Sequence, residues 1–76
     1  MIHELETVIL SRDIEEYNLR SGDIGTAVYV YNNNAAYEVE FIAGSGETIA
    51  VLTLTPQDVR PIRQQEILHV RELALA

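Results

Sequence analysis

Apolar and polar residues alternate most strictly in the segment Tyr37-Glu38-Val39-Glu40-Phe41. Its three hydrophobic residues fall on one face of an extended chain, and its two glutamates fall on the other. Side chains along a strand point to opposite faces in turn. The segment therefore predicts a strand with one buried face and one wet face, as in an antiparallel sheet.

Four further segments predict strands, because they are rich in β-branched residues and are bounded by turn-forming residues. They are residues 7–10, 24–31, 48–54 and 59–62. The predicted turns include Asn32-Asn33-Asn34 and Gly44-Ser45-Gly46, whose residues favour left-handed or local hydrogen-bonded conformations. Two glycines, Gly22 and Gly25, allow a sharp bend into the second strand.

The second and fourth predicted strands differ in how their faces are filled. Period two places Ile24, Thr26, Val28 and Val30 on one face of the second strand and Ala27, Tyr29 and Tyr31 on the other. The fourth strand is apolar on both faces, with Ile49 and Val51 on one side and Ala50, Leu52 and Leu54 on the other. An exposed apolar face is a liability, so we expect another segment or subunit to cover it.

The chain after the fourth strand predicts one helical turn, a short strand and an extension. Thr55 can cap the turn, with Pro56 at its first position and Asp58 three residues after the cap, while Pro61 confines the last strand to an edge. The extension fits a short amphipathic helix or a strand. The helical face holds Ile67, Val70, Leu73 and Ala74, and the strand face holds Ile67, His69, Arg71, Leu73 and Leu75.

These elements predict an all-β fold, a small SH3-like barrel of five strands with a one-turn 3-10 helix before the last strand. Residues 1–63 form the barrel, and residues 64–76 form a short C-terminal helix or strand packed on the barrel or on a partner. A chain of 76 residues buries only about 60% of its unfolded surface. It contains no cysteine for a disulfide, so its core relies on packing or on association.

The composition is acidic, with twelve acidic residues against five basic ones and a net charge of −7. All five bases are arginine, and there is no lysine. Nucleic-acid binders usually carry a basic stripe, so the charge argues against DNA and RNA. The negative charge would attract a basic partner, although it is explained equally well as a means of keeping a small protein soluble. No apolar run approaches the roughly 20 residues that span a bilayer, and we expect a cytoplasmic protein without a membrane segment.

No constellation of residues predicts catalysis, a metal or a cofactor. The two histidines, His3 and His69, lack the spacing of a metal site. Ser45 has no evident base, and its Gly-Ser-Gly setting predicts a hairpin turn rather than a nucleophile. Glu38 and Glu40 lie on the wet face, where paired carboxylates are solvated rather than tuned for acid–base work. We therefore expect a protein that is not an enzyme and holds no cofactor.

Two features predict contact with another protein. Tyrosines on neighbouring strands form a rigid amphipathic surface of the kind enriched at binding hot spots, and SH3 domains bind peptides through such a surface. Ordinary barrel packing is the alternative for these tyrosines, and packing on the chain's own barrel is the alternative for the extension. The candidate interaction residues are Tyr29, Tyr31, Tyr37, Leu52, Leu54, Ile67, His69, Val70, Arg71 and Leu73.

Seven segments, taken in order, resemble a family of small bacterial proteins described as a domain of unknown function (DUF4926). They are residues 5–10, 12–14, 22–26, 37–41, 52–54, 59–61 and 66–73. The resemblance implies an SH3-like fold and a stand-alone bacterial protein, and some members are thought to neutralise a toxin encoded beside them. It implies no catalytic or binding residues. Residues 22–28 are also similar to the KOW element of ribosomal and transcription proteins, which implies nucleic-acid binding.

The leading hypothesis is a non-enzymatic protein-binding module, either an antitoxin or a regulatory partner of a basic protein. A homodimer through the extension or the fourth strand is compatible with it. The alternative is a KOW-like barrel associated with nucleic acid. The KOW element uses basic loops where it binds RNA, whereas Glu15, Glu16 and Glu38 lie near the corresponding positions here.

Overall fold

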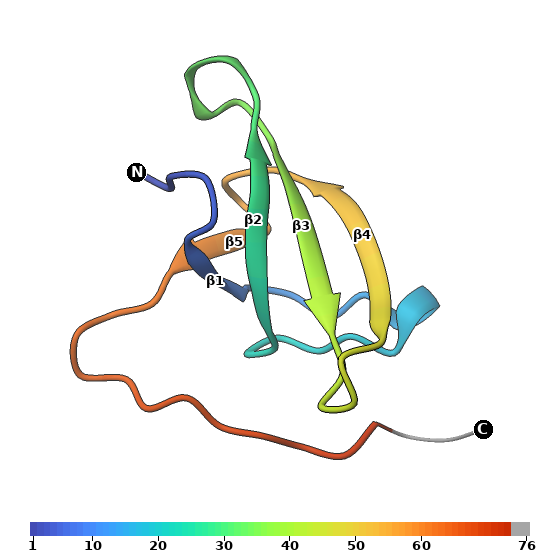
Figure 1. The fold of residues 1–76 in the computed structure, drawn as a ribbon. Coiled ribbons are helices and arrows are strands. Elements are labelled where there is room, and N and C mark those ends of the chain that lie inside the picture. The colour runs from blue at the N-terminus through green and yellow to red at the C-terminus, as the bar shows by residue number, and fades with distance from the viewer. Residues whose placement is uncertain (74–76) are drawn as a thin grey trace.

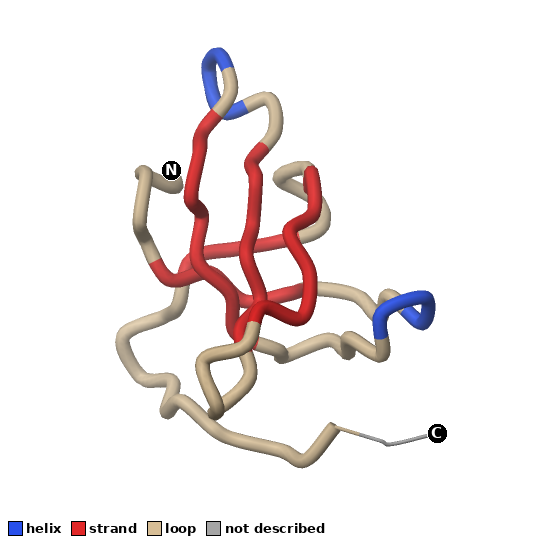
Figure 2. The backbone as a smooth tube through the Cα atoms, turned by 45° about the vertical axis from the view of Figure 1, so that its right-hand side comes forward, coloured by secondary structure: helices blue, strands red, loops and turns tan. Residues whose placement is uncertain are grey.

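The computed structural model describes residues 1–73, which form one antiparallel sheet of five strands (Figure 1). The strands are β1 (Thr7–Leu10), β2 (Ile24–Val30), β3 (Tyr37–Ile42), β4 (Thr48–Leu54) and β5 (Val59–Pro61), in the spatial order β4-β3-β2-β1-β5. β2, β3 and β4 run side by side, and β1 and β5 cross behind them, so that the sheet curls on itself (Figure 2). The predicted fold class, an all-β five-stranded barrel, is confirmed.

The core lies inside this curled sheet and is built from alternate residues of each strand. Val8, Leu10, Val39, Phe41 and Val59 are almost completely buried, and Phe41 is the largest of them. In β3 the predicted alternation is confirmed, because Tyr37, Val39 and Phe41 are buried while the two glutamates between them are half-buried on the other face. Burial of these apolar side chains is the main stabilising contribution to a chain of this size.

A β-bulge in β2 corrects the predicted division of that strand into two faces. Ala27 pairs with Val39, whereas Tyr29 pairs with the adjacent Glu38, so the register shifts between them. Ala27 is completely buried, but Tyr29 is 50% exposed. The two residues therefore do not share a face as period two predicts, because a bulge inserts one extra residue and re-aims the side chains that follow it.

The two glycines that bracket Asp23 have different structural roles. Gly22 has a φ of +98°, a left-handed conformation that favours glycine, and its N–H donates to the Leu10 carbonyl at 2.7 Å. Gly25 instead lies directly against the core, where an added Cβ would come within 2.7 Å of Val39 Cγ1 and 3.0 Å of Phe41 Cε1. The first glycine makes the turn into β2, and the second lets β2 pass close to β3.

The helical turns differ from the prediction in position. Residues 55–58 form a single hydrogen-bonded turn with the predicted cap, in which Asp58 Oδ2 accepts from the Thr55 N–H at 2.9 Å and from Thr55 Oγ1 at 3.0 Å. The 3-10 helices are η1 (Glu15–Tyr17) and η2 (Asn32–Asn34) instead. Within residues 1–73, no helix is long and apolar enough to cross a bilayer.

The C-terminal segment does not form the predicted helix or strand in the part that the structure describes. From Ile62 to Leu73 it follows an irregular, extended path around the barrel (Figure 1). Its path is fixed by side-chain contacts to the barrel and by one local turn, in which the Glu66 N–H donates to the Arg63 carbonyl at 3.1 Å. An isolated short helix would be marginal in water. Ala74 and Leu75, which belong to the predicted helical and strand faces, lie outside the described residues.

Candidate functional site

Two aromatic side chains project from the end of β2 onto the outer face of the sheet. The rings of Tyr29 and Tyr31 meet edge to face, with centroids 4.9 Å apart and an interplanar angle of 77°. This is a favourable arrangement for an aromatic pair, and the β2 bulge makes it possible by turning Tyr29 outward. Together with Glu38, Val51 and Thr53 on the neighbouring strands, these residues form what we call the tyrosine surface.

Hydrogen bonds fix the carboxylate at the centre of the tyrosine surface. Glu38 Oε2 accepts from Thr53 Oγ1 at 2.7 Å and from Tyr31 Oη at 2.5 Å. The hydrogen bonds from Thr53 and then Tyr31 lower the pKa of Glu38, and the hydrogen bond to Glu38 raises the pKa of Tyr31. At neutral pH the surface therefore presents a charged carboxylate beside a protonated phenol.

Apolar area and a second carboxylate extend this surface across the sheet. Glu40 lies opposite Val51 in the β3–β4 ladder and accepts from Thr48 Oγ1 at 2.8 Å. Val51 is 52% exposed, so the apolar outer face predicted for β4 is not covered there by the described residues. β4 is also one of the two edge strands of the sheet, so its outer edge has no neighbouring strand among the described residues.

Three of the predicted interaction residues on the strands belong to the core instead. Tyr37 and Leu54 are each 3% exposed, and they pair with each other across β3 and β4. Leu52 is half-buried and packs against the core cluster. The alternation that buries one face of β3 and β4 also keeps these side chains from a partner, so of this group only Tyr29 and Tyr31 present their rings to solvent.

A second candidate surface lies where the C-terminal segment crosses the end of the barrel. We call residues 62–73 the tail. The tail is fixed near its start by Arg60, whose Nη1 and Nη2 donate to the two carboxylate oxygens of Glu66 at 2.8 and 2.6 Å. The Arg63 N–H also donates to Glu66 Oε1 at 2.8 Å. The hydrogen bonds from Arg60 and then Arg63 lower the pKa of Glu66 to about 2.

The Glu66 carboxyl is expected to titrate with a midpoint of about 2 in the folded protein, measured by NMR of its side-chain carbon. A free glutamate titrates at about 4.3, so the pair stabilises the fold above that pH, and this stabilisation is lost as the pH falls toward 2. Arg60→Gln should return the midpoint to the ordinary range. A midpoint near 4 in the wild-type chain would mean that the Arg60 fork does not form in solution.

The tail is fixed a second time by Arg71, which reaches back to the turn before β2. Its Nε and Nη2 donate to the two oxygens of the Asp23 carboxylate at 2.8 and 2.6 Å, and Nη2 also donates to the Asn18 carbonyl at 2.8 Å. Burial raises the pKa of Asp23, but hydrogen bonds from Arg71 and from the Arg20 N–H outweigh it, and the pKa lies below the ordinary value. Asp23 is thus charged at neutral pH, and its carboxylate is oriented to bind a guanidinium.

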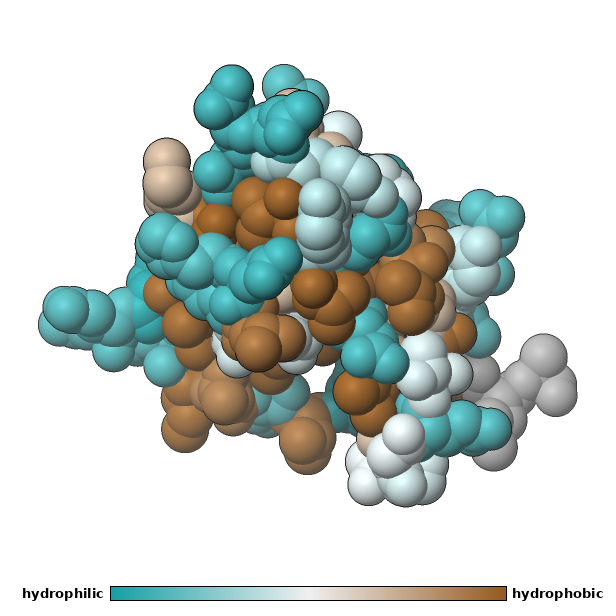
Figure 3. Space-filling view, turned by 45° about the horizontal axis from the view of Figure 1, so that its top comes forward, coloured by the Kyte–Doolittle hydropathy of each residue, from teal (hydrophilic) through white to brown (hydrophobic). Residues whose placement is uncertain are grey.

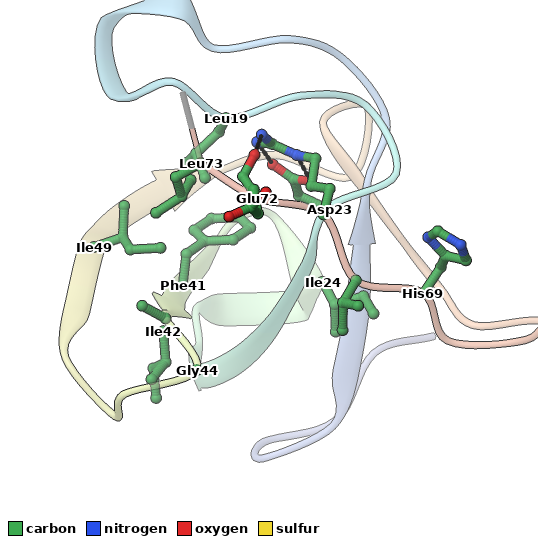
Figure 4. Close-up of a pocket in the computed structure, with 13 residues that line it drawn as sticks. Leu19, Asp23, Ile24, Phe41, Ile42, Gly44, Ile49, His69, Glu72 and Leu73 are labelled. Carbon is green, nitrogen blue, oxygen red and sulfur yellow. Dashed lines mark hydrogen bonds and ion pairs between the residues drawn. The ribbon is translucent and has the colours of Figure 1, made fainter. Parts of the chain in front are cut away.

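Between the tail and the barrel lies a pocket of roughly 630 Å³, which we call the tail groove (Figure 4). Its barrel wall is apolar and includes Leu19, Ile24, Phe41 and Ile49, and Asp23 stands at its edge. The half-buried Leu73 contributes the facing side chain. The space-filling view shows hydrophobic side chains around an opening on this side of the molecule (Figure 3).

The other predicted contact residues of the tail are largely exposed. Ile67 and Val70 are 87% and 88% exposed, and His69 is exposed and lies apart from the apolar wall (Figure 4). His69 and Val70 also line the tail groove, but Arg71 is the predicted tail residue with hydrogen bonds to the barrel, and Leu73 is the half-buried one. Asp23, which accepts the hydrogen bonds of Arg71, was not predicted as a site residue, although its place between Gly22 and Ile24-Gly25 was a signal that could have identified it.

The described residues offer no arrangement suited to a metal ion. Within residues 1–73 no group of three or more histidine, cysteine, aspartate or glutamate side chains is close enough to hold one. The tyrosine surface and the tail groove instead provide carboxylates that are fixed by hydrogen bonds beside apolar side chains. Such an arrangement can bind a cationic or aromatic group of a partner.

Comparison with known proteins adds one finding. A family model described as Domain of unknown function (DUF4926) matches residues 4–61. No curated protein and no solved structure matches the chain. The matched stretch contains all five strands, the tyrosine surface and Asp23. It ends before the resemblance predicted for residues 66–73, so the tail is not part of the match.

Proposed function

We propose that this chain, which belongs to the family described as Domain of unknown function (DUF4926), is a non-enzymatic protein-binding module that recognises a basic partner. The observation that carries the proposal is the tyrosine surface. It combines two aromatic rings packed edge to face with a carboxylate that is fixed between two hydroxyl donors.

The tyrosine surface has the composition of a binding hot spot. Tyrosine supplies a large contact area at a low cost in side-chain entropy, and it is enriched among the residues that dominate binding energy. The ring of Tyr29 is half exposed in the free chain, and the hydroxyl of Tyr31 is already fixed by Glu38. A partner would therefore meet a surface that needs little rearrangement, which favours affinity.

The charge distribution favours a basic partner. Glu38 and Glu40 accept hydrogen bonds from neutral hydroxyls, which leave their negative charges in place. Arg12, Arg60 and Arg71 are each already paired with a carboxylate of the same chain. An acidic face of this kind attracts positively charged proteins and repels nucleic acid.

We further propose that the protein is bacterial and cytoplasmic, that its barrel is SH3-like or KOW-like, and that it acts as an antitoxin or regulatory subunit. An inhibitor of a basic protein needs a complementary surface and no catalytic group, and the tyrosine surface meets that requirement.

The proposal is tested by affinity capture from cells of the source organism with three forms of the chain. The wild-type chain and a Tyr17→Ser control are expected to retain the same basic protein, whereas the Tyr29→Ser/Tyr31→Ser double variant should lose at least nine-tenths of it. Tyr17 is the matched control, because it is an exposed tyrosine in η1, away from the tyrosine surface. Loss of two hot-spot tyrosines typically costs more than about 2 kcal/mol in binding.

Two results would contradict the proposed function. One is that the same proteins are retained by all three forms, which would mean that the tyrosines are ordinary surface residues. The other is a salt-dependent shift of RNA or DNA at low ionic strength, which would favour the KOW-like alternative.

A further inference from the structure

The tail contacts the barrel in the way that a bound linear peptide contacts its receptor. Arg71 makes its three hydrogen bonds to the barrel through its guanidinium, and Leu73, two residues later, faces the apolar wall. Residues two apart in an extended chain lie on the same side. Glu72, the one residue between them, and Val70, which precedes Arg71, are exposed.

The fit between tail and barrel is incomplete. A pocket of roughly 630 Å³ that is partly open to solvent remains between them, so the tail covers the apolar wall only in part. Each unfilled gap loses the dispersion contacts that a close-fitting side chain would make. A ligand with larger apolar side chains would therefore make more contacts with the apolar wall than the tail does.

The barrel side of the groove is selective for a guanidinium. The Asp23 carboxylate is oriented by the Arg20 N–H and offers both oxygens to a planar fork, and the Asn18 carbonyl adds a third acceptor. The negative charge of Asp13 also acts on the cation held there. Arginine matches this bidentate geometry, whereas lysine presents only a point charge.

We propose that the tail groove is a binding site for an extended peptide of a partner protein, one that carries an arginine and, two residues later, a large aliphatic residue. The tail occupies this site in the absence of the partner. The acceptors and the apolar wall all lie within the stretch that matches the family model, residues 4–61, and the tail lies outside it. The site lies at the opposite end of β2 from the tyrosine surface (Figure 1), and it does not depend on the function proposed for that surface.

The test uses the full chain and a fluorescent peptide with the sequence of residues 66–73, measured by fluorescence anisotropy. In the Arg71→Ala variant the groove loses its own arginine, so the peptide should bind at least about tenfold more tightly than to the wild-type chain, where the tail competes at a high effective concentration. A peptide with alanine in place of its arginine should bind at least tenfold more weakly. A peptide with lysine there should fall between the two.

A receptor variant locates the binding. Asp23→Asn in the Arg71→Ala chain keeps an acceptor for the Arg20 N–H and removes the charge, so peptide affinity should fall by tenfold or more. Since the peptide variants leave the protein unchanged, they keep the test valid even where Asp23→Asn disturbs the fold.

The proposal is overturned in either of two ways. The first is a folded Arg71→Ala chain, with an intact amide NMR spectrum, that binds no peptide at millimolar concentration or binds the arginine and alanine peptides equally. The second is a wild-type dimer in sedimentation that disappears with Arg71→Ala, which would identify a second copy's tail as the occupant.

Discussion

Phe41→Ala is expected to lower the free energy of unfolding by about 3–5 kcal/mol, the range for a buried phenylalanine truncated to alanine. Phe41 is 1% exposed and is the largest of the fully buried side chains. It fills the space that Gly25 leaves open in β2, and the surrounding strands cannot close the cavity without breaking their pairing. A chain of 76 residues has a total stability of roughly 4–11 kcal/mol, so this one change removes a large share of it.

Urea denaturation followed by circular dichroism measures this effect. The matched control is Ile42→Ala, since Ile42 is the next residue in β3 but is half exposed on the outer face. It should cost about 1 kcal/mol or less, in keeping with the apolar area that it removes from contact. Equal decreases in the free energy of unfolding for the two variants would contradict the assignment of the core to one face of β3.

Gly25→Ala is expected to destabilise the protein by about 1–3 kcal/mol, although alanine is otherwise the better strand residue. The added methyl group would come within 2.7 Å of Val39 Cγ1, within 3.0 Å of Phe41 Cε1 and within 3.1 Å of the Glu40 carbonyl oxygen. Those atoms belong to the packed core and to a paired strand, so they cannot move aside freely, and overpacking of this kind typically costs about that much.

Gly44→Ala is the control for Gly25→Ala. An added Cβ at Gly44 meets no atom within 4 Å, and its φ is not in the left-handed range. The free energy of unfolding of this variant should lie within about 0.5 kcal/mol of the wild-type value. It could be slightly higher, because alanine lowers the conformational entropy of the unfolded chain. Equal midpoints for both alanine variants in thermal unfolding would mean that β2 and β3 do not approach as closely as the structure shows.

Local pattern was enough to predict the strands of this protein. Each strand is flanked by turn residues, and the alternation along β3 specifies which face is buried. It also indicated that Tyr37 points inward, so its assignment as an interaction residue was wrong for a reason that the pattern already contained. The fold class follows largely from these short-range signals, because β1 to β4 pair in chain order in an antiparallel sheet and only β5 pairs out of order, with β1.

The bulge and the tail could not be predicted, because both depend on contacts between distant residues. The bulge in β2 is set by the register against β3, and no residue between Ala27 and Tyr29 has a distinctive backbone preference. The path of the tail is set by Arg71 and Asp23, which are 48 positions apart in sequence. A hydrophobic periodicity of 3.6 or 2 residues indicates which side chains share a face of a helix or strand. It does not indicate which distant carboxylate an arginine will bind.

The most direct test of the proposed function is photo-crosslinking in cells of the source organism, with photoreactive benzoylphenylalanine in place of Tyr29 or, as the control, in place of Tyr17. We expect one basic protein to be crosslinked through position 29 and to be absent from the products at position 17. No product at position 29, or the same products at both positions, would contradict it.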